Sequence, residues 1–477
     1  MKKYILIAFV LVFGTGAWAQ NEQDALRYSQ TFYGGSARTV SMGGAFGALG
    51  GDFGALSINP AGIALYRQGE FSFTTNFNSM NTEASYLGSK MSDSWYKMGF
   101  SHFGVVVPIK SRRDAESGTN SLNFGFGYNK LKDFNNTVAI KAVNNSNSLV
   151  DEFVYTANKY DDWDSFTDGL AWETFLIDYD SLTGVYYSDF DVSGYGQTQK
   201  RTITTKGGIG EYLFSLGANL GNKVYVGGSV GVQRAEYEET WIHTETDPTD
   251  IIDYFEQFSF RNVLYTTGTG LNVKFGFIAR PIDWLRVGGA IHTPTFFKLK
   301  DDFTSSMSTD LADGESTHVY DANGEYNYEL TTPFRAIGSL AFILKQFAII
   351  SVDYEYVDYA SARLRGSDYD FFDENQAVSN RYRAANNIRL GGEFHLGPMF
   401  FRGGYALYGT PYVSGEPNDI QVYQALSGGF GYRTAAFFMD LGLVRSGFDQ
   451  KYFLYNENAA DLTNSKTRFM ATLGFRF

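Results

Sequence analysis

The sequence predicts an all-β protein, a 14-stranded antiparallel transmembrane β-barrel with an N-terminal hatch inside the lumen. Three observations support this fold class. Apolar and polar residues alternate from about residue 69 to the C-terminus, which is typical of β-strands. Aromatic residues make up 17% of the 477 residues, and sheets favour them. Short and long connections alternate along the chain, as in outer-membrane barrels, which have tight turns at one end and long loops at the other.

The first nineteen residues have the pattern of a secretory signal peptide. Lys2 and Lys3 precede an apolar run from Tyr4 to Phe13, and the sequence AWA at 17–19 has the small residues of a cleavage site. The apolar run is short for a helix that must span about 20 residues. We therefore expect cleavage after Ala19 and export. The predicted parts of the chain are a signal peptide at 1–19, a hatch at 20–66 and a transmembrane barrel at 67–477.

Composition excludes several classes of function. The formal charge of −13 argues against nucleic acid as a partner, since its phosphates repel an acidic protein. The chain has no Cys, so it has neither disulfides nor thiolate metal ligands. The segment 144–199 is strongly acidic and has a single lysine, Lys159. Such a charge run predicts a solvated loop. A bound partner or a calcium ion at this loop remain alternatives.

The C-terminal sequence TRFMATLGFRF shows the alternation best. Phe469, Leu473 and Phe475 fall on one face, and Arg468 and Thr472 fall on the other. Similar ladders predict fourteen strands in all. They lie near 69–88, 97–109, 120–143, 200–219, 222–241, 257–279, 282–300, 317–343, 346–362, 382–397, 399–409, 420–433, 435–455 and 465–477.

The connections place the two ends of the barrel. In an antiparallel sheet successive connections lie at opposite ends, so all the short ones belong to one end and all the long ones to the other. The short connections lie near residues 220, 279, 344, 396 and 433; the long loops are 144–199, 242–256, 301–316, 363–381, 410–419 and 456–464.

Polar residues opposite the apolar ladders predict a lumen. Both charge signs occur there, and burying such a set in a dry soluble core would be very costly. A polar lumenal network is predicted from Arg335, Asp353, Glu355, Arg389, Glu393 and Arg402, with Arg286, Asp440, Arg468 and Arg476 on the same faces. A barrel of fourteen strands encloses more space than its own side chains fill. A plug or an open pore must account for that space.

The glycine-rich stretch GGAFGALGGDFGALSINPAGIA at 43–64 is the candidate plug. It precedes the first strand, consists mainly of small and apolar residues, and lacks the alternation of a strand. We expect a short helix near Ser41 to Leu49 and a turn at Asn59 to Gly62.

The chain resembles the FadL/TodX-type outer-membrane transporters of long-chain fatty acids and aromatic hydrocarbons, whose members in the Bacteroidota are often called hemin receptors. The stretch SARTVSMGGAFGALGGDFGALSINPAGIAL at 36–65 is similar to the opening of that family. Further matches are GTGLNVKFGFIARPIDWLRVGGAIHTPT at 268–295, TPFRAIGSLAF with ISVDYEYVDYAS at 332–361, and IRLGGEFHL with FFRGGYAL at 388–407.

This resemblance implies a hatch that fills the lumen, a pocket for an apolar ligand, and a kinked third strand that lets ligand leave sideways. The family's hatch motif falls on Asn59, Pro60, Ala61 and Gly62. The candidates for the apolar pocket are Met42, Phe46, Phe53, Leu56 and Ile58, whose alternative role is packing of the hatch against the wall. The candidates for the kink are Asp133, Asn135 and Asn136, because Asp and Asn weaken strands; an ordinary turn is the alternative.

The predicted function is passive uptake of hydrophobic small molecules, fatty acid-like or aromatic, across the outer membrane. No catalytic residue, metal or cofactor is expected. The G-x-S-x-G match around Ser229 lies within a predicted strand, whereas a hydrolase elbow needs a strand, a sharp turn and a helix. We expect a monomer in outer-membrane lipid, assembled by the barrel assembly machinery through the strand ending in Phe477. The alternative is a scaffold or cargo-carrying component of a protein secretion system.

Overall fold

The computed structural model describes residues 22–110, 118–160, 163–312, 317–345, 347–456 and 458–477. The predicted signal peptide, 1–19, lies outside the described residues. Among the helices that are described, none is both long and apolar enough to cross a membrane.

Fourteen antiparallel wall strands form a closed barrel across the described residues, as the sequence predicts. The barrel closes where β1 pairs with β20, from Glu70 opposite Arg476 to Ser85 opposite Asp461. The uninterrupted wall strands are β1 (Glu70–Tyr86), β2 (Ser89–Lys110), β7 (Thr198–Leu220), β8 (Val224–Thr246), β9 (Phe255–Ile282), β16 (Ala384–Leu396), β17 (Met399–Tyr408), β18 (Tyr423–Arg433), β19 (Phe437–Tyr455) and β20 (Asn458–Arg476). The interrupted ones are β3 (Thr119–Asp133) with β4 (Asn136–Val143), β10 (Leu285–His292) with β11 (Phe296–Leu311), β12 (Thr317–Thr331) with β13 (Arg335–Leu344), and β14 (Ala348–Asp358) with β15 (Arg363–Arg365).

An apolar belt surrounds the barrel next to its tight turns. On β8 the outward side chains Val224, Val226 and Val230 are exposed, and farther along the strand Arg234 and Glu236 take over the same face. The nine residues Val224–Val232 span about 23 Å along the barrel axis, at a rise of about 3.3 Å per residue and a tilt of about 40°. Outer-membrane barrels carry a belt about 25 Å tall. The belt therefore matches the hydrocarbon core of a membrane.

Several strands continue well past this belt, so parts of three predicted loops are strand. β8 runs to Thr246 and β9 begins at Phe255; β11 and β12 form one long hairpin, as do β19 and β20. The predictions of loops at 242–256, 301–316 and 456–464 are wrong in these parts. Outside the membrane the outward face of a strand is polar, so polar sequence there does not indicate a loop.

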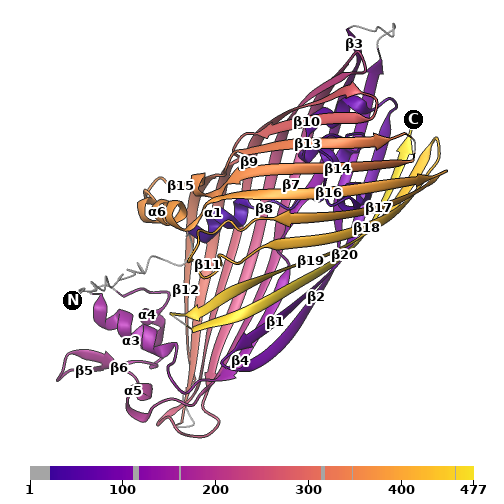
Figure 1. The fold of residues 1–477 in the computed structure, drawn as a ribbon. Coiled ribbons are helices and arrows are strands. Elements are labelled where there is room, and N and C mark those ends of the chain that lie inside the picture. Colours follow the sequence, from indigo (N-terminus) through magenta and orange to yellow (C-terminus); the bar gives the residue numbers. More distant parts are fainter. Residues whose placement is uncertain (1–21, 111–117, 161–162, 313–316, 346, 457) are drawn as a thin grey trace, which may run out of the picture.

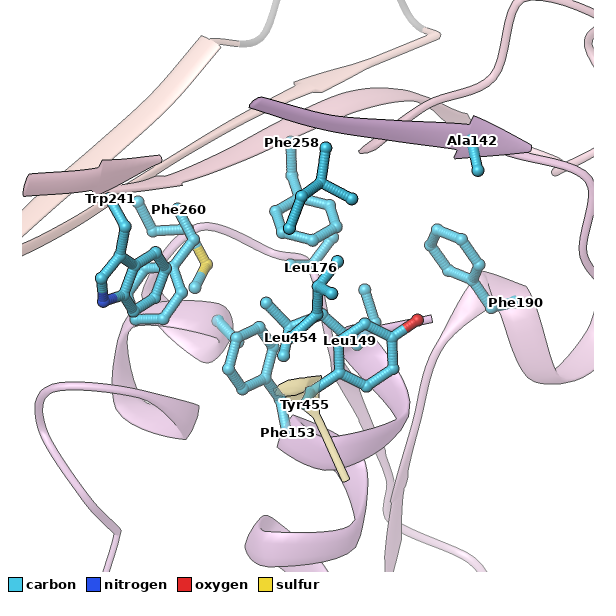
Figure 2. Packing of buried hydrophobic residues seen from close by; sticks show 14 of the residues in the cluster. Ala142, Leu149, Phe153, Leu176, Phe190, Trp241, Phe258, Phe260, Leu454 and Tyr455 are labelled. Carbon is cyan, nitrogen blue, oxygen red and sulfur yellow. The ribbon is translucent and has the colours of Figure 1, made fainter. Parts of the chain in front are cut away.

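The acidic segment 144–199 folds into a unit on the barrel end that carries the long loops, which we call the external unit (Figure 1). It contains α3 (Val150–Lys159), α4 (Asp168–Glu173), β5 (Asp178–Asp180), β6 (Val185–Tyr187) and α5 (Asp189–Ser193). Figure 2 shows Leu149, Phe153 and Phe190 of this unit beside Phe258 and Tyr455 of the wall. The prediction of a solvated loop is therefore wrong, because the segment contributes buried apolar side chains to a core shared with the wall.

The N-terminal segment, residues 22–66, lies within the ring of strands (Figure 1). It contains α1 (Glu22–Ser29), α2 (Ala37–Ser41), η1 (Phe53–Ser57) and η2 (Pro60–Leu65). α2 packs on β17, β18, β19 and β20, whereas η2 packs on β7, β8 and β9 of the wall. The helix expected at Ser41–Leu49 lies earlier, at Ala37–Ser41, because Gly43 and Gly44 adopt positive φ angles of 64° and 76° that end it. Asn59 caps η2 where a turn was predicted, with the Ala61 N–H donating to its side chain at 3.0 Å.

α1 reaches the half of the lumen nearer the external unit, where it packs beside α6 (Phe372–Arg381). Arg381 of α6 donates to Glu22 of α1 at 2.5 Å. The N-terminal segment thus runs from the outer half of the lumen at α1 to the start of β1 at the end with the tight turns (Figure 1).

Candidate functional site

A cavity of about 520 Å³ lies between α1 and the inner wall, and we call it the lumenal cavity. It is lined by α1, by the interruption between β3 and β4, and by parts of β7, β8 and β17 to β20. Phe32, Phe134, Tyr237, Tyr408 and Tyr423 contribute aromatic rings to its lining.

The aromatic rings of the cavity pack on one another and on two cations. Phe32 lies 5.0 Å from the ring of Tyr408 and 4.3 Å from that of Tyr423. The Lys132 ammonium lies 5.3 Å from the centre of the Phe134 ring, and the Arg27 guanidinium lies 4.2 Å above Tyr237. Small-molecule sites typically combine apolar walls with a few fixed polar groups. The lining mixes these rings with many charged and polar side chains, among them Asp133, Lys466 and Arg468, so it offers an organic molecule both apolar and polar contacts.

Lys132 is held in the cavity by neutral oxygens. Its Nζ donates to the Arg27 carbonyl at 2.8 Å and to the Gln30 side-chain oxygen at 3.4 Å. Among the ion pairs of the described residues, none includes this ammonium. A cation so placed can also bind the acidic or carbonyl group of a ligand.

The five residues predicted to line an apolar pocket lie elsewhere. Met42, Phe46, Phe53, Leu56 and Ile58 are at most 1% exposed, and none of them lines the lumenal cavity. They pack against the inner wall in the role named above as their alternative. Their close packing has a steric cause, since the wall carries glycines where several of these side chains meet it.

Phe53 shows how close this packing is. A Cβ atom at Gly104 would lie 2.3 Å from Phe53 Cγ, and one at Gly127 would lie 2.6 Å from its Cε1. Likewise, a Cβ atom at Gly391 would lie 2.8 Å from Met42 Cβ. The inner wall is thus shaped to receive the N-terminal segment.

The predicted hatch motif forms a joint between the N-terminal segment and the wall. Asn59 donates to the Gly47 carbonyl at 2.6 Å and to the Phe277 carbonyl of β9 at 3.1 Å. Pro60 and Ala61 follow it in the first turn of η2, and Gly62 packs directly against Gly50.

The predicted lumenal network is divided into two groups, and both reach the N-terminal segment. In the first, Glu355 accepts from Arg335 at 2.9 Å and from Arg389 at 3.1 Å. Arg389 lies 3.6 Å from Asp353, which accepts from the backbone N–H groups of Phe46 and Gly47.

In the second group, Glu393 accepts from Arg402 at 2.5 Å and from Arg38 of α2, whose Nε and Nη2 both donate at 3.0 Å. Burial disfavours the charged form of Arg38. The Glu393 carboxylate outweighs this effect and raises the pKa of the Arg38 guanidinium above its usual value. The two hydrogen bonds of this pair hold α2 to the wall.

Sequence reasoning missed a third anchor. Lys274 and Glu211 pair at 2.5 Å, and Glu211 also accepts from Ser57 of η1 at 2.9 Å. Asn123 donates to the Ile63 and Tyr66 carbonyls at 2.7 and 2.9 Å. The alternation of the strands could have predicted this anchor, because Glu211, Lys274 and Asn123 all lie on the inward face, opposite the apolar ladder of their strands.

The candidate kink residues lie together at the interruption of the third wall strand. β3 ends at Asp133 and β4 begins at Asn136. Asp133 accepts from Asn78 of β1 at 2.9 Å and from Lys466 of β20 at 3.1 Å. Asn135 accepts from Lys97 of β2 at 3.0 Å.

Other chemical motifs have structural roles. Ser229 lies in the middle of β8 and shares a hydrogen bond of 2.6 Å with Ser215, without the strand–turn–helix context of a hydrolase nucleophile. Within the part of the chain that the structure describes, no three His, Asp or Glu residues are placed to hold a metal ion.

The closed wall, its apolar belt and its occupied lumen define a transmembrane β-barrel of the outer-membrane type. Comparison with protein-family models and with curated protein sequences gives no match. Solved structures do match, and they show that the chain has the FadL/TodX-type fold.

A FadL homologue of Pseudomonas aeruginosa matches with a TM-score of 0.58 and 14% identity, over 94% of this chain and 100% of that one. The Pseudomonas putida toluene transporter TodX matches with a TM-score of 0.55 and 11% identity, over 94% and 99%. The Ralstonia pickettii toluene transporter TbuX matches with a TM-score of 0.50 and 13% identity, over 94% and 99%. The predicted resemblance is confirmed at the level of the fold.

Proposed function

We propose that this barrel mediates passive uptake of hydrophobic small molecules across the outer membrane. The observation that carries the proposal is the lumenal cavity, which lies between α1 and the wall of a FadL/TodX-type fold and has aromatic rings in its lining. An apolar molecule crosses the polar surface of the outer membrane slowly. A cavity lined by rings gives it a desolvated route.

The lining favours a fatty acid-like or aromatic ligand. The rings of Phe32, Phe134 and Tyr408 offer flat apolar surfaces, and the Lys132 ammonium offers one polar anchor. Such a ligand is consistent with the similar structures, which include two toluene transporters and a FadL homologue.

Residues 20–66 act in this proposal as a hatch that must move for ligand to pass. The Glu355 and Glu393 groups and the Glu211–Lys274 pair hold the hatch to the wall. Ligand binding in the cavity displaces α1 first, since α1 forms one side of the cavity. Net uptake follows from binding and mass action.

The break at Asp133, Asn135 and Asn136 provides the sideways exit. These residues line the lumenal cavity. Of the two edges of β4, one pairs with β7, and none of the described strands pairs with the other. A ligand that moves past them enters the membrane without crossing a continuous strand ladder.

The test is uptake into liposomes that contain the purified barrel, with labelled long-chain fatty acid, monoaromatic hydrocarbon, sterol and haem as probes. Lys132→Met should slow uptake of the fatty acid about tenfold and leave the monoaromatic unchanged, since a hydrogen bond to a charged group contributes about 1.5–3 kcal/mol. The matched control is Lys141→Met, on the exposed face of β4. The proposal would be refuted if no probe entered liposomes with the barrel faster than liposomes without it.

A second candidate function is that of a scaffold for protein secretion, which the external unit favours. Tyr155, Phe175 and Tyr179 are 55%, 55% and 46% exposed on it, and such aromatic side chains are enriched in protein interfaces. Replacing all three with Ala in the living cell should stop secretion but not uptake if the unit carries cargo. Unchanged secretion would leave uptake as the function.

A further inference from the structure

The outer part of β12 has a strand edge without a neighbour. β12 pairs with β11 along its whole length. On its other edge it pairs with β15, and only through Glu329, Leu330 and Thr331. None of the described strands pairs with that edge at residues 319–328. We call this part of β12 the free edge, and at about 3.3 Å per residue it is about 33 Å long.

The backbone groups of the free edge are not capped by side chains either. β19 also continues past its neighbour β18, but there Asn418 donates to the Lys451 carbonyl at 3.2 Å and accepts from the Lys451 N–H at 2.7 Å. Among the described residues outside the hairpin, none makes such a hydrogen bond to the backbone of residues 319–328. The free edge therefore presents unpaired N–H and C=O groups that can extend the sheet.

The strand that carries the free edge is held in place by packing. The hairpin of β11 and β12 lies against α4 of the external unit (Figure 1). The ring of Phe303 on β11 lies 5.0 Å from that of Phe166, and the ring of Tyr326 lies 6.1 Å from that of Phe371. A partner that pairs with the free edge therefore meets a strand that is already ordered, which lowers the entropic cost of binding.

The usual protections of a strand edge are absent from β12. Natural proteins block such edges with Pro, with Lys or with a bulge. β12 contains neither Pro nor Lys, and its register with β11 has no shift.

The outward side chains along β12 are acidic. Asp321, Glu325 and Glu329 are exposed, and β12 has neither Lys nor Arg. Lys300 of β11 pairs with Glu325 at 3.0 Å and with Asp302 at 3.1 Å, so it neutralises only part of this charge. Cross-strand pairs of opposite charge stabilise a sheet, whereas like charges placed opposite one another destabilise it. The outward face therefore favours a basic neighbour and disfavours a second copy of β12.

The inward side chains along the free edge carry no charge. They belong to Tyr320, Ala322, Gly324, Tyr326 and Tyr328. An added strand alternates its side chains between the two faces of the sheet. Every second residue of such a strand therefore lies beside aromatic or small side chains.

We propose that the free edge of β12 binds an extended segment of another protein as an added β-strand, and that basic and apolar residues alternate in this segment. Its backbone continues the ladder of β11 and β12. Its basic side chains lie beside Asp321 and Glu325, and its apolar side chains lie beside the tyrosines. No residue of β12 lines the lumenal cavity, so this site is separate from the proposed uptake.

Binding of a model peptide to the purified barrel tests the proposal. The probe is a short fluorescent peptide in which Lys and Val alternate, and the protein is kept in a zwitterionic detergent that does not attract the peptide. The control peptide has Pro in place of each Val, which keeps the charge but removes N–H groups that a ladder needs. The control should bind at least about tenfold more weakly, since main-chain hydrogen bonds provide the affinity in strand addition. Equal binding of the two peptides, or no binding of the first, overturns the proposal.

Charge reversal locates the binding site. Asp321→Lys with Glu325→Lys should weaken binding about tenfold, because two attractive cross-strand pairs become repulsive. The matched control is Asp449→Lys with Asp461→Lys, which makes the same change in charge on the exposed face of the hairpin of β19 and β20. An equal loss of affinity in both variants shows attraction to the overall charge and overturns the assignment to β12.

Disulfide trapping tests the pairing itself, since the chain has no Cys of its own. A peptide with Cys at a central Lys position should form a disulfide with Asn323→Cys, because adjacent strands lie about 4.8 Å apart. The matched control is Thr304→Cys on β11, directly opposite Asn323 in the ladder. It lies two strand spacings from the peptide, about 10 Å and beyond the reach of a disulfide. Trapping at Asn323→Cys at least about fivefold faster than at Thr304→Cys supports strand addition; equal rates overturn it.

Discussion

Arg38→Met tests whether the hatch is held by the charged pairs described above. Arg38 is 12% exposed in its side chain, and its partner Glu393 is fully buried. Removing one partner of a buried ion pair costs about 3–5 kcal/mol. Glu393 keeps Arg402 at 2.5 Å and His395 at 2.9 Å as partners, so part of this cost is avoided. We take about 2 kcal/mol as the loss in docking free energy of the hatch, below the full cost of an orphaned buried charge.

A loss of about 2 kcal/mol raises the population of the displaced hatch about 30-fold, since about 1.4 kcal/mol corresponds to a factor of ten. The assay is single-channel conductance in planar bilayers, where displacement of the hatch appears as brief openings. The matched control is Arg280→Met, because Arg280 pairs with the exposed Asp283 at a tight turn and makes no ion pair with the hatch. Equal opening frequencies in the two variants would refute the claim that the Arg38–Glu393 pair holds the hatch.

Two further predictions concern packing. Gly104→Ala places a methyl group against Phe53 and should weaken docking of the hatch by about 1–3 kcal/mol, seen as faster proteolysis of the hatch in the folded barrel; Gly338→Ala, which has open space at its Cβ, should have no such effect. Phe153→Ala removes a ring from the core of the external unit and should destabilise that unit by about 3–5 kcal/mol. Chymotrypsin should then cut within 144–199 while the barrel keeps its resistance to unfolding in detergent; an uncut unit would contradict this prediction.

The number and phase of the wall strands could be predicted because both are local properties. In β20, Phe469 and Phe475 face outward at 47% exposure each, while Met470 and Thr472 between them are buried. The same alternation placed Arg335 and Glu355 on the inward face. A side-chain period of two needs no knowledge of distant partners.

Other features could not be predicted because they depend on contacts between remote residues. Arg38 and Glu393 are 355 positions apart, and no local pattern pairs them. The apolar residues of the external unit are dispersed in an acidic segment, although Val150, Phe153 and Ala157 have helical spacing. Their burial depends on Phe258 and Tyr455 from strands far along the chain.

The sequence by itself determined a membrane-spanning barrel with a polar lumen, because alternation and loop length follow directly from strand geometry. Only the tertiary structure decided which side chains line the lumenal cavity, which ion pairs hold the N-terminal segment, and where the wall lacks a ladder. The physical reason is that the barrel closes a large volume around that segment. Two things set what fills that volume. One is steric fit, in which wall glycines receive Phe53 and Met42 of the N-terminal segment, and the other is the pairing of buried charges.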